Sequence, residues 1–274
     1  MPVIAMSREI GSGGSEVAAG VADELGLKVI NSEIVAGSVA GRLGVEESTV
    51  QRYLSGSASL LDRWQIDKRK LARYTSEEIV QLAQQGNVLI RGWGAAALFR
   101  DIPQIVSVRI CAPLDSRVHA MMHRLGARDH QDVRGEIERF DAAHAKTMNT
   151  SFDVNWNDPL LYHIVLNSAR IPVDTCIKYV CQLARDPRIH EDAAIGPALA
   201  DKLLKLRVMA ALNEEISIGE APAGVTVSVT NGRVTLTGAS STGYLRDKVE
   251  TVASRVVGVR SIDNQIVSVP ARGG

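Results

Sequence analysis

Hydrophobic and polar positions follow two different periods along the first two-thirds of the chain. Apolar residues recur every three or four positions in some stretches, which predicts helices at about 77–85, 114–125, 134–147 and 172–184. Between them lie short, nearly continuous apolar runs, which predict buried strands at 3–6, 27–30, 87–90, 105–111 and 162–166. Strands that alternate with helices indicate an α/β fold, with a parallel sheet covered by helices on both faces.

Residues 44–75 interrupt this alternation. The segment is polar and helix-prone, and it contains the basic cluster Lys68-Arg69-Lys70. We expect an inserted helical element over the carboxyl edge of the sheet.

The pattern changes at residues 186–200, where Asp186-Pro187-Arg188 and Gly196-Pro197 punctuate a polar linker. Beyond the linker, apolar residues at helical spacing predict a helix, and alternating valines after it predict a strand. Asn231-Gly232 then predicts a type I′ hairpin turn. A second helical period and a last strand follow. The sequence therefore predicts a first domain over 1–185, a linker over 186–200 and a small α-β-β-α-β domain over 201–270.

Composition and charge exclude several classes of protein. Lys+Arg and Asp+Glu both number 31, so the chain has no net charge that would attract nucleic acid. No apolar run reaches the roughly 18 residues that a membrane helix needs. The cysteines Cys111, Cys176 and Cys181 have spacings that suit neither a zinc site nor a redox pair. We expect reduced core thiols in a cytoplasmic protein.

The richest motif is Ser-Arg-Glu-Ile-Gly-Ser-Gly-Gly-Ser-Glu at residues 7–16, between a predicted strand and a predicted helix. In this setting, backbone N–H groups and a helix N-terminus bind phosphate. Against the common pattern G-x-x-x-x-G-K-S/T, Gly13 keeps the second glycine, Gly14 replaces the lysine and Arg8 replaces the first glycine. The predicted nucleotide-binding residues are Arg8, Gly11, Ser12, Gly13, Gly14 and Ser15.

Each of these assignments has a structural alternative. The glycines of the loop also suit a turn that only packs helix against strand. Arg8 either swings over the loop to supply the missing charge or forms a surface ion pair with Glu9 or Glu16. The Ser15 hydroxyl suits either phosphate or Mg²⁺ binding, or a helix N-cap.

Two further groups of residues are candidates. Arg124 and Arg128 lie in a nearly neutral segment, 117–146, which is either a lid whose arginines clamp phosphates or a solvated helical hairpin. His119 and His123 have a spacing that binds zinc, but no cysteine or conspicuous carboxylate accompanies them, so we expect no metal site. Trp93 either fills space above the sheet edge or stacks on a base.

The C-terminal region resembles the BON domain, a small bacterial module. The resemblance rests on the alternating strand 225–229, on Asn-Gly-Arg-Val-Thr-Leu-Thr-Gly at 231–238 and on Val257-Gly258-Val259. It implies binding of a phospholipid or small ligand, or assembly with a protein, including a second copy of the chain. It implies no catalytic residues.

Residues 1–185 resemble the cytidylate-kinase-like family of P-loop proteins. The resemblance rests on the motif of residues 4–16 and on further matches at 86–90, 112–118, 156–159 and 162–168. That family also lacks the loop lysine. The resemblance implies a nucleoside-monophosphate-kinase fold, with Mg²⁺ and a nucleoside triphosphate as donor and a nucleoside monophosphate as acceptor. It also places Arg124 and Arg128 in the lid.

Four positions depart from the family pattern. Trp93 replaces an arginine, Asn31 and His163 each replace an aspartate, and an arginine-rich helix reads Asp-Ala-Ala-His-Ala at 141–145. Phosphoryl transfer depends on cations that neutralise developing charge. The sequence therefore supports two hypotheses: a nucleotide-binding protein with weak phosphoryl transfer, or an inactive kinase-like sensor or scaffold whose BON domain binds a ligand, a lipid or a protein.

Overall fold

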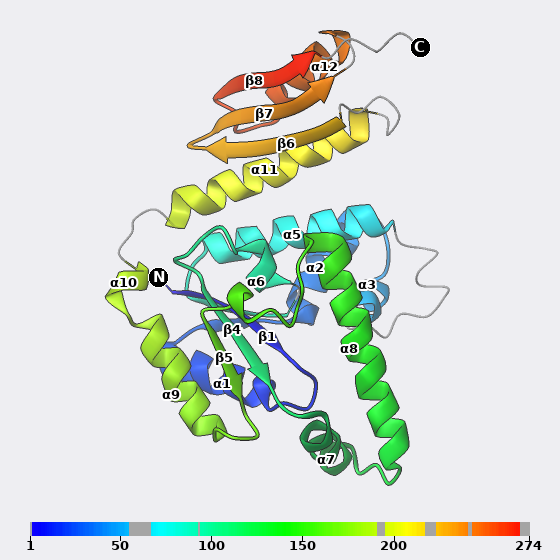
Figure 1. Cartoon of the computed structure of the whole chain (residues 1–274), viewed down its shortest axis with the longest axis vertical. Helices are drawn as coiled ribbons and strands as arrows, with labels where there is room; N and C mark the ends of the chain where they lie inside the picture. The colour runs from blue at the N-terminus through cyan, green and yellow to red at the C-terminus, as the bar shows by residue number, and fades with distance from the viewer. Residues whose placement is uncertain are drawn as a thin grey trace. The chain divides into compact units, whose positions relative to one another are not determined.

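The structure is a computed structural model that describes residues 2–54, 67–92, 94–190, 195–216, 223–240 and 243–268. The chain divides into two compact units, Met1–Ala193 and Ala194–Gly274 (Figure 1). The division falls inside the linker that the sequence predicts. The two units are described separately below.

The first unit is built on a five-stranded parallel sheet in the order β2-β3-β1-β4-β5. The predicted α/β fold is therefore confirmed, and strand ends differ from prediction by one or two residues. The last strand, for example, begins at Ile164, because Tyr162 and His163 still belong to the preceding loop. The strands are β1 (Val3–Arg8), β2 (Lys28–Ile30), β3 (Val88–Arg91), β4 (Val106–Cys111) and β5 (Ile164–Asn167).

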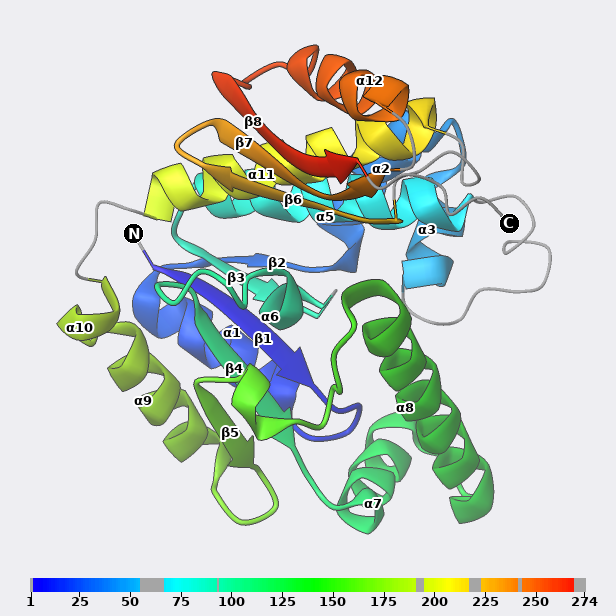
Figure 2. The same cartoon turned by 45° about the horizontal axis from the view of Figure 1, so that its top comes forward.

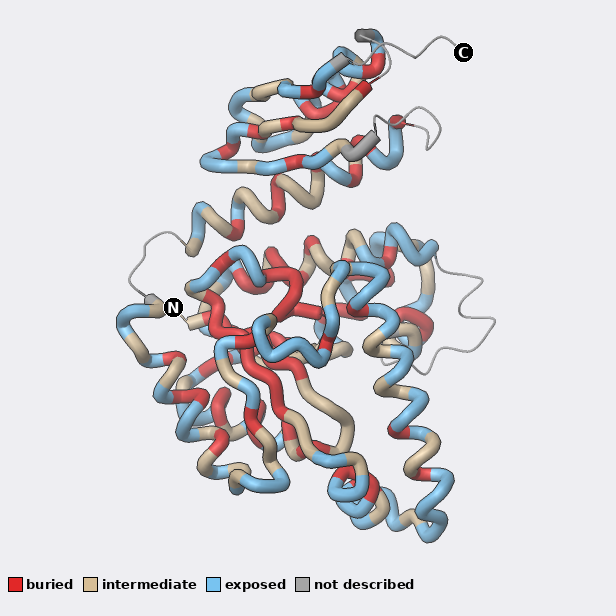
Figure 3. The backbone as a smooth tube through the Cα atoms, in the orientation of Figure 1, coloured by how far each residue is buried: buried red, intermediate tan, exposed pale blue. Residues whose placement is uncertain are grey.

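Helices cover both faces of this sheet (Figures 1 and 2). On one face, α1 (Gly14–Leu25) and α9 (Val173–Ala184) pack against each other and against the strands. The other face is covered by α5 (Lys68–Gln84) and the short α6 (Ala95–Leu98). The strands between these layers are the most buried part of the unit (Figure 3).

The inserted element that the sequence predicts is helical where it is described. It contains α3 (Glu47–Leu54) and the start of α5, and it follows directly on α2 (Ser32–Leu43), while residues 55–66 lie outside the described residues. The buried Glu77 carboxylate joins α5 to α2, because it pairs with Arg73 at 2.9 Å and with Arg42 at 2.5 Å.

A helical hairpin extends beyond the carboxyl ends of the strands (Figure 1). It consists of α7 (Leu114–Leu125) and α8 (His130–Phe152). Helix α8 is longer than the predicted 134–147, because the Asp129 side chain caps its start by accepting the N–H groups of residues 131 and 132. The short η1 (Pro159–Leu161) follows, and α10 (Pro187–His190) ends the described part of this unit.

The second unit has the predicted α-β-β-α-β order. Its strands pair in the order β6-β7-β8, antiparallel between β6 and β7 and parallel between β7 and β8. Asn231 and Gly232 both have positive φ, 51° and 77°, as the predicted type I′ turn requires. The elements are α11 (Ile195–Glu215), β6 (Ala223–Thr230), β7 (Arg233–Ser240), α12 (Gly243–Ser254) and β8 (Ser261–Ser268).

We predict that this second unit folds alone, as a piece that begins at Ile195. It has its own core, formed by α11, α12 and the inner face of the sheet. Helix α11 starts inside the predicted linker, and its Asp201 carboxylate accepts the N–H groups of Asn231 and Gly232 at 2.6 and 2.9 Å. Calorimetry should show one cooperative transition for 195–274, and Asp201→Ala should lower its stability by about 1–3 kcal/mol. A broad, non-cooperative melt would contradict independent folding.

Two further sequence expectations are met. All three cysteines are free thiols, and Cys176 and Cys181 are buried in the core. None of the helices within the described ranges is long and apolar enough to cross a membrane.

Candidate functional site

The loop between β1 and α1 has a backbone that only glycine adopts without strain at two positions. Gly11 has φ +80° and Gly13 has φ +70°. A Cβ atom at Gly11 would also lie 2.7 Å from the carbonyl oxygen of Arg117. The loop is therefore a specific conformation that is packed against α7.

Several amides of this loop are available to a ligand. Within the described part of the chain, no hydrogen bond engages the N–H groups of Gly11, Gly13 or Gly14. Because α1 begins at Gly14, the first amides of the helix point in the same region and its dipole favours an anion there. This arrangement suits phosphate.

Ser12 maintains the shape of the loop. Its hydroxyl donates to the carbonyl oxygens of Glu9 at 2.7 Å and Ile110 at 3.2 Å, and its amide donates to Glu9 at 3.2 Å. The Ser168 hydroxyl, just after β5, donates to the Ser12 carbonyl at 2.6 Å. The polar groups of Ser12 are thus used inside the protein, although the sequence suggested that they face the ligand.

Arg8 lies against Gly14, the position of the missing lysine. A Cβ atom on Gly14 would be 2.6 Å from the Cβ and 3.1 Å from the Cδ of Arg8. Any side chain at residue 14 would therefore compete with Arg8 for space. Arg8 forms no ion pair with a described residue, and the predicted alternative of a pair with Glu9 is wrong, because that carboxylate binds other arginines.

Two further arginines act electrostatically on Arg8. Arg8 ends β1, Arg91 ends the neighbouring β3, and Arg124 lies in the last turn of α7. The pKa of Arg8 is lowered, first by burial and then by the charges of Arg91 and Arg124, while Glu16 opposes the shift. Such mutual repulsion is relieved by an anion with several charges, such as a nucleotide phosphate chain.

The two predicted lid arginines are placed differently. Arg124 is exposed, donates to the sulfur of Met121 and lies close enough to Arg8 to affect it electrostatically. Arg128 is exposed in the connection between α7 and α8 and forms no hydrogen bond or ion pair with another described residue. Of the two, Arg124 is the one whose charge acts on Arg8.

A buried ionic network holds the loop to the helical hairpin. The Glu9 carboxylate pairs with Arg109 at 2.8 Å and with Arg117 at 3.4 Å, and it accepts the amide of Ala112 at 3.0 Å. Arg117 continues to Asp141 on α8 at 2.8 Å. The side chains of Arg109 and Arg117 are 5% and 7% exposed, so their charges depend on these partners.

Arg109 is enclosed by the segment before β5. Its guanidinium donates to the Trp156 carbonyl and to Asn157 Oδ1, each at 2.8 Å, and lies 4.2 Å from the Trp156 ring. The Trp156 indole N–H in turn donates to Ser7 on β1 at 2.7 Å. The sequence analysis missed Arg91, Arg109 and this network. The available signal was an arginine in the middle of an otherwise apolar strand.

Three of the four departures from the family pattern have structural roles. Asn31 caps α2 by accepting the amides of Glu33 and Ile34, as an aspartate would. His163 Nδ1 lies 2.7 Å from the Ser107 hydroxyl and joins β4 to the segment before β5. Asp141 pairs with Arg117 as described above. The fourth, Trp93, lies outside the described residues, so neither prediction for it is tested.

A cavity of about 310 Å³ lies between α5 and α8. His144 lines it, with its ring 4.4 Å from the Trp156 ring in a T-shaped contact and 6.3 Å from the parallel Phe140 ring. Burial, and after it the charges of Arg109 and Arg8, lower the pKa of His144 to about 4, while Asp141 opposes the shift. The imidazole is therefore neutral at neutral pH.

We predict that His144 makes the first unit less stable in mild acid. Its folded pKa of about 4 is below its ordinary value of 6.5, so the unfolded chain binds the proton first. Above pH 6.5 the imidazole is neutral in both the folded and the unfolded chain, so it does not change the free energy of unfolding. That free energy falls by up to about 3 kcal/mol as the pH drops from 6.5 to 4. His144→Gln should flatten melting temperature against pH in this window, and the exposed His119→Gln should not. An unchanged slope in His144→Gln would contradict the assignment.

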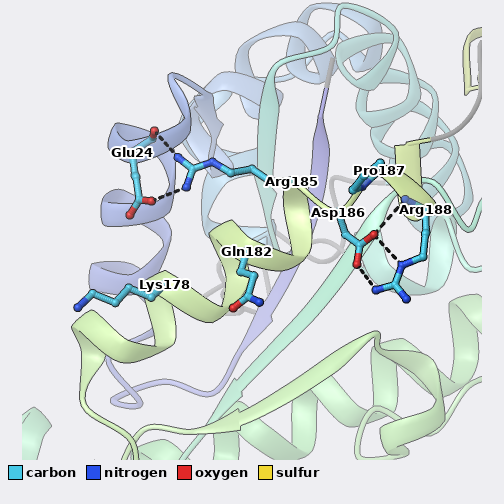
Figure 4. Close-up of a pocket in the computed structure, with 7 residues that line it drawn as sticks. All are labelled: Glu24, Lys178, Gln182, Arg185, Asp186, Pro187 and Arg188. Atoms are coloured by element: carbon cyan, nitrogen blue, oxygen red, sulfur yellow. Dashed lines mark hydrogen bonds and ion pairs between the residues drawn. The ribbon is translucent and has the colours of Figure 1, made fainter.

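A second depression, of about 700 Å³, lies by the ends of α1 and α9 (Figure 4). Two of its cations are paired: Arg185 with Glu24 at 2.9 Å, and Arg188 with Asp186 at 2.5 Å. Lys178 also lines it. Because both arginines are already paired with carboxylates, we do not place the anion site here.

The residues at the start of α1 are compatible with Mg²⁺. The helix is capped by Gly13, so the alternative of Ser15 as its N-cap is wrong. No hydrogen bond within the described residues engages the Ser15 hydroxyl, and Glu16 is exposed one residue on. Nucleotide-bound Mg²⁺ takes most of its oxygens from phosphates and water, so one protein hydroxyl is sufficient. His119 and His123 are not joined by a third potential ligand among the described residues.

Comparison with known proteins identifies the first unit. The model of the cytidylate kinase-like family matches residues 3–170, and the chain belongs to this family. A cytidylate kinase of Pyrobaculum aerophilum is 23% identical over 185 residues, which cover 66% of this chain and 94% of that protein. A cytidylate kinase of Saccharolobus islandicus is 23% identical over 193 residues, which cover 68% and 94%.

The second unit and the fold are also matched. The BON domain model matches residues 200–270, so the chain joins a cytidylate kinase-like domain to a BON domain. A solved structure of an uncharacterized protein from Eubacterium ventriosum superimposes with a TM-score of 0.53 at 18% identity, covering 68% of this chain and 99% of that one. This likeness supports the kinase-like fold.

Proposed function

We propose that the kinase-like domain binds the phosphates of a nucleotide, or of another phosphorylated ligand, at residues 8–15. The observation that carries this proposal is the loop itself: its amides are unengaged at the start of α1, and Arg8 packs against Gly14. The charges of Arg91 and Arg124 also act on Arg8. Together these arginines replace the point charge of the missing lysine. The nucleotide-kinase names of the relatives support the same ligand class.

The geometry assigns a part to each group in this proposal. The amides of Gly11, Gly13 and Gly14 hold phosphate oxygens, and the arginines neutralise charge that develops on them. Mg²⁺, which the Ser15 hydroxyl would help to hold, supplies further charge neutralisation on the phosphate chain. Glu9 is not available as a base, because Arg109 and Arg117 hold its carboxylate.

Ligand-dependent melting tests the proposal. The full chain is heated with a panel of Mg²⁺ nucleoside triphosphates, with the monophosphates and with inorganic phosphate. A ligand at 100 times its dissociation constant stabilises the folded state by about 2.7 kcal/mol. We expect at least one triphosphate to raise the melting temperature of the first unit. A flat response across the whole panel would reject the proposal.

We predict that phosphoryl transfer to nucleoside monophosphates is weak or absent. Trp93 replaces an arginine of the family pattern, and Asp141 occupies a helix that is arginine-rich in the family. Each lost cationic contact costs about 3 kcal/mol of transition-state stabilisation, or roughly a hundredfold in rate. A coupled assay with CMP and other monophosphates measures this activity. Turnover above about 10 per second, an ordinary enzyme rate, would refute the prediction.

The second candidate function is a non-catalytic sensor or scaffold. The same missing cations favour it, as does the use of the Ser12 hydroxyl and amide inside the loop. In this case ligand binding at the loop is retained, and the BON domain acts as the effector. Binding without turnover, for every acceptor tried, would distinguish this function from an enzyme.

For the BON domain we propose an interaction role, with an apolar or phospholipid-like ligand or with a second copy of the chain. Tyr244 and Val267 are 74% and 58% exposed at the end of the sheet where β7 leads into α12. The free thiols favour the cytoplasm as the place of this interaction. Removing residues 195–274 should change the mass distribution or lipid binding but leave nucleotide binding intact. No change in either would mean that the domain has no interaction role.

A further inference from the structure

The cavity between α5 and α8 has an unusual lining for a site that receives an anion. Its described lining contains one charged side chain, the exposed Lys68, and neither arginine nor carboxylate. The volume of about 310 Å³ is at the small end of the range for ligand sites. Hydroxyl groups dominate its polar part, from Tyr53, Thr75, Ser76, Thr147, Thr150 and Ser151.

Thr75 adds a second observation at this cavity. The residue is 7% exposed, and its hydroxyl oxygen is buried without a hydrogen-bond partner in the described part of the chain. Native proteins rarely leave such a group unsatisfied. A hydroxyl group on a ligand serves the Thr75 hydroxyl as either donor or acceptor.

His144 connects the cavity with the phosphate loop. Its ring lines the cavity, and no hydrogen bond to a described residue engages either ring nitrogen. The charged groups that act on this imidazole are Arg8, Arg109 and Asp141, and Arg8 is the residue that lies over Gly14 of the loop. His144 also contacts the Trp156 ring, and the Trp156 indole N–H donates to Ser7, the residue before Arg8. The neutral imidazole is therefore connected to the end of β1 at which the loop begins.

We propose that the acceptor at this site is an uncharged, hydroxyl-bearing molecule of sugar or nucleoside size, and that His144 accepts the proton of the attacking hydroxyl. The inference rests on the proposed function, because it takes the donor triphosphate to lie on the loop. It differs from that function in the acceptor, which is an alcohol rather than a monophosphate.

The chemistry of the step explains why a base is needed. As the acceptor oxygen bonds to the γ-phosphorus, the bond from that phosphorus to the β–γ bridging oxygen breaks and the diphosphate leaves with the electron pair. The hydroxyl proton passes to His144 and then to water. A monophosphate acceptor is largely ionised at neutral pH and has no such proton to lose. Phosphates on the loop would also neutralise Arg8, which makes His144 a stronger base.

The test measures ADP release from Mg·ATP by the full chain, with water alone, with cytidine, with D-ribose and with CMP. We expect cytidine or ribose to accelerate release at least tenfold over water, and CMP to give no comparable acceleration. His144→Gln should lower the accelerated rate by about 10²–10⁴-fold, the usual contribution of a general base, with little change in KM. The exposed His119→Gln is the matched control. Thr75→Val should raise KM for the accelerating acceptor.

Three results would overturn the inference: faster release with CMP than with either neutral acceptor, no acceleration by cytidine or ribose, or full activity in His144→Gln. Melting temperatures measured at pH 8 with and without Mg·ATP distinguish a failure of the proposed function from a failure of this inference. If Mg·ATP does not stabilise the wild-type protein, the proposed function has failed. If Mg·ATP stabilises the wild type and His144→Gln equally, nucleotide binding is intact in both. The rates of ADP release then test the class of acceptor and the role of His144 as the base.

Discussion

Gly13→Val should abolish the stabilisation of the first unit by Mg·ATP, while Gly26→Val leaves it intact. Both glycines have left-handed backbones, with φ of +70° and +65°, so both substitutions introduce strain of about 1–3 kcal/mol. Only Gly13 precedes the first amide of α1 inside the loop, whereas Gly26 ends the same helix with no atom within 4 Å of a new Cβ. The pair therefore separates the loss of the phosphate site from a general loss of stability.

The measurement is the shift in melting temperature between the free and the Mg·ATP-saturated protein. The wild type and Gly26→Val should gain about 2.7 kcal/mol at a hundredfold excess over the dissociation constant, and Gly13→Val should gain nothing. An equal gain in both variants would place the nucleotide elsewhere. An equal loss of this stabilisation in both variants would mean that backbone strain alone causes the effect.

Arg117→Met should destabilise the first unit by about 3–5 kcal/mol, because it leaves Asp141 and one side of Glu9 as buried charges without their partner. For a unit of this size, the loss corresponds to a fall in melting temperature of about 10 °C. Arg117 also donates to the carbonyls of Ala112 and Ile10, so the loop loses its link to α7 as well.

Arg134→Met is the matched control. Arg134 also joins α7 to α8, through Asp115, but that carboxylate is 80% exposed and the pair lies in solvent. Exposed ion pairs contribute about 0–1 kcal/mol, so the melting temperature should change little. Similar shifts for Arg117→Met and Arg134→Met would contradict the structural importance of the buried network. Because the chain divides into two compact units, we expect two melting transitions, and the transition of the first unit is the one to follow.

The sequence predicted the fold and the loop because their determinants are local. Strand, glycine turn and helix follow each other within residues 3–25, and the type I′ turn depends on two adjacent residues, Asn231 and Gly232. Helix ends were less predictable. The side chain of Asp129 caps α8, so the helix begins earlier than its apolar pattern predicts. Asp129 can be assigned as the cap only once the loop before the helix is known.

The cations of the site could be predicted only in part: Arg8 and Arg124 were predicted, but Arg91 and Arg109 come from distant parts of the chain and were not. Arg8 and Arg91 are neighbours only through the parallel pairing of β1 with β3. Glu9 and Arg109 are 100 residues apart in sequence and 2.8 Å apart in space. The sequence alone treated Glu9 as a surface partner for Arg8. The alternation of Ser107 and Arg109 with Val106, Val108 and Ile110 was the available sign that one face of β4 is polar.

The central claim is that arginines replace the missing lysine in holding a nucleotide. Calorimetric titration of Mg·ATP into the full chain, its Arg8→Met variant and the exposed Arg139→Met variant tests this claim most directly. A charge-assisted hydrogen bond contributes about 1.5–3 kcal/mol, so Arg8→Met should weaken binding at least tenfold. We expect one site in the wild type and an affinity within twofold of it in Arg139→Met. No saturable binding by the wild type, or equal affinity in Arg8→Met, would contradict the account.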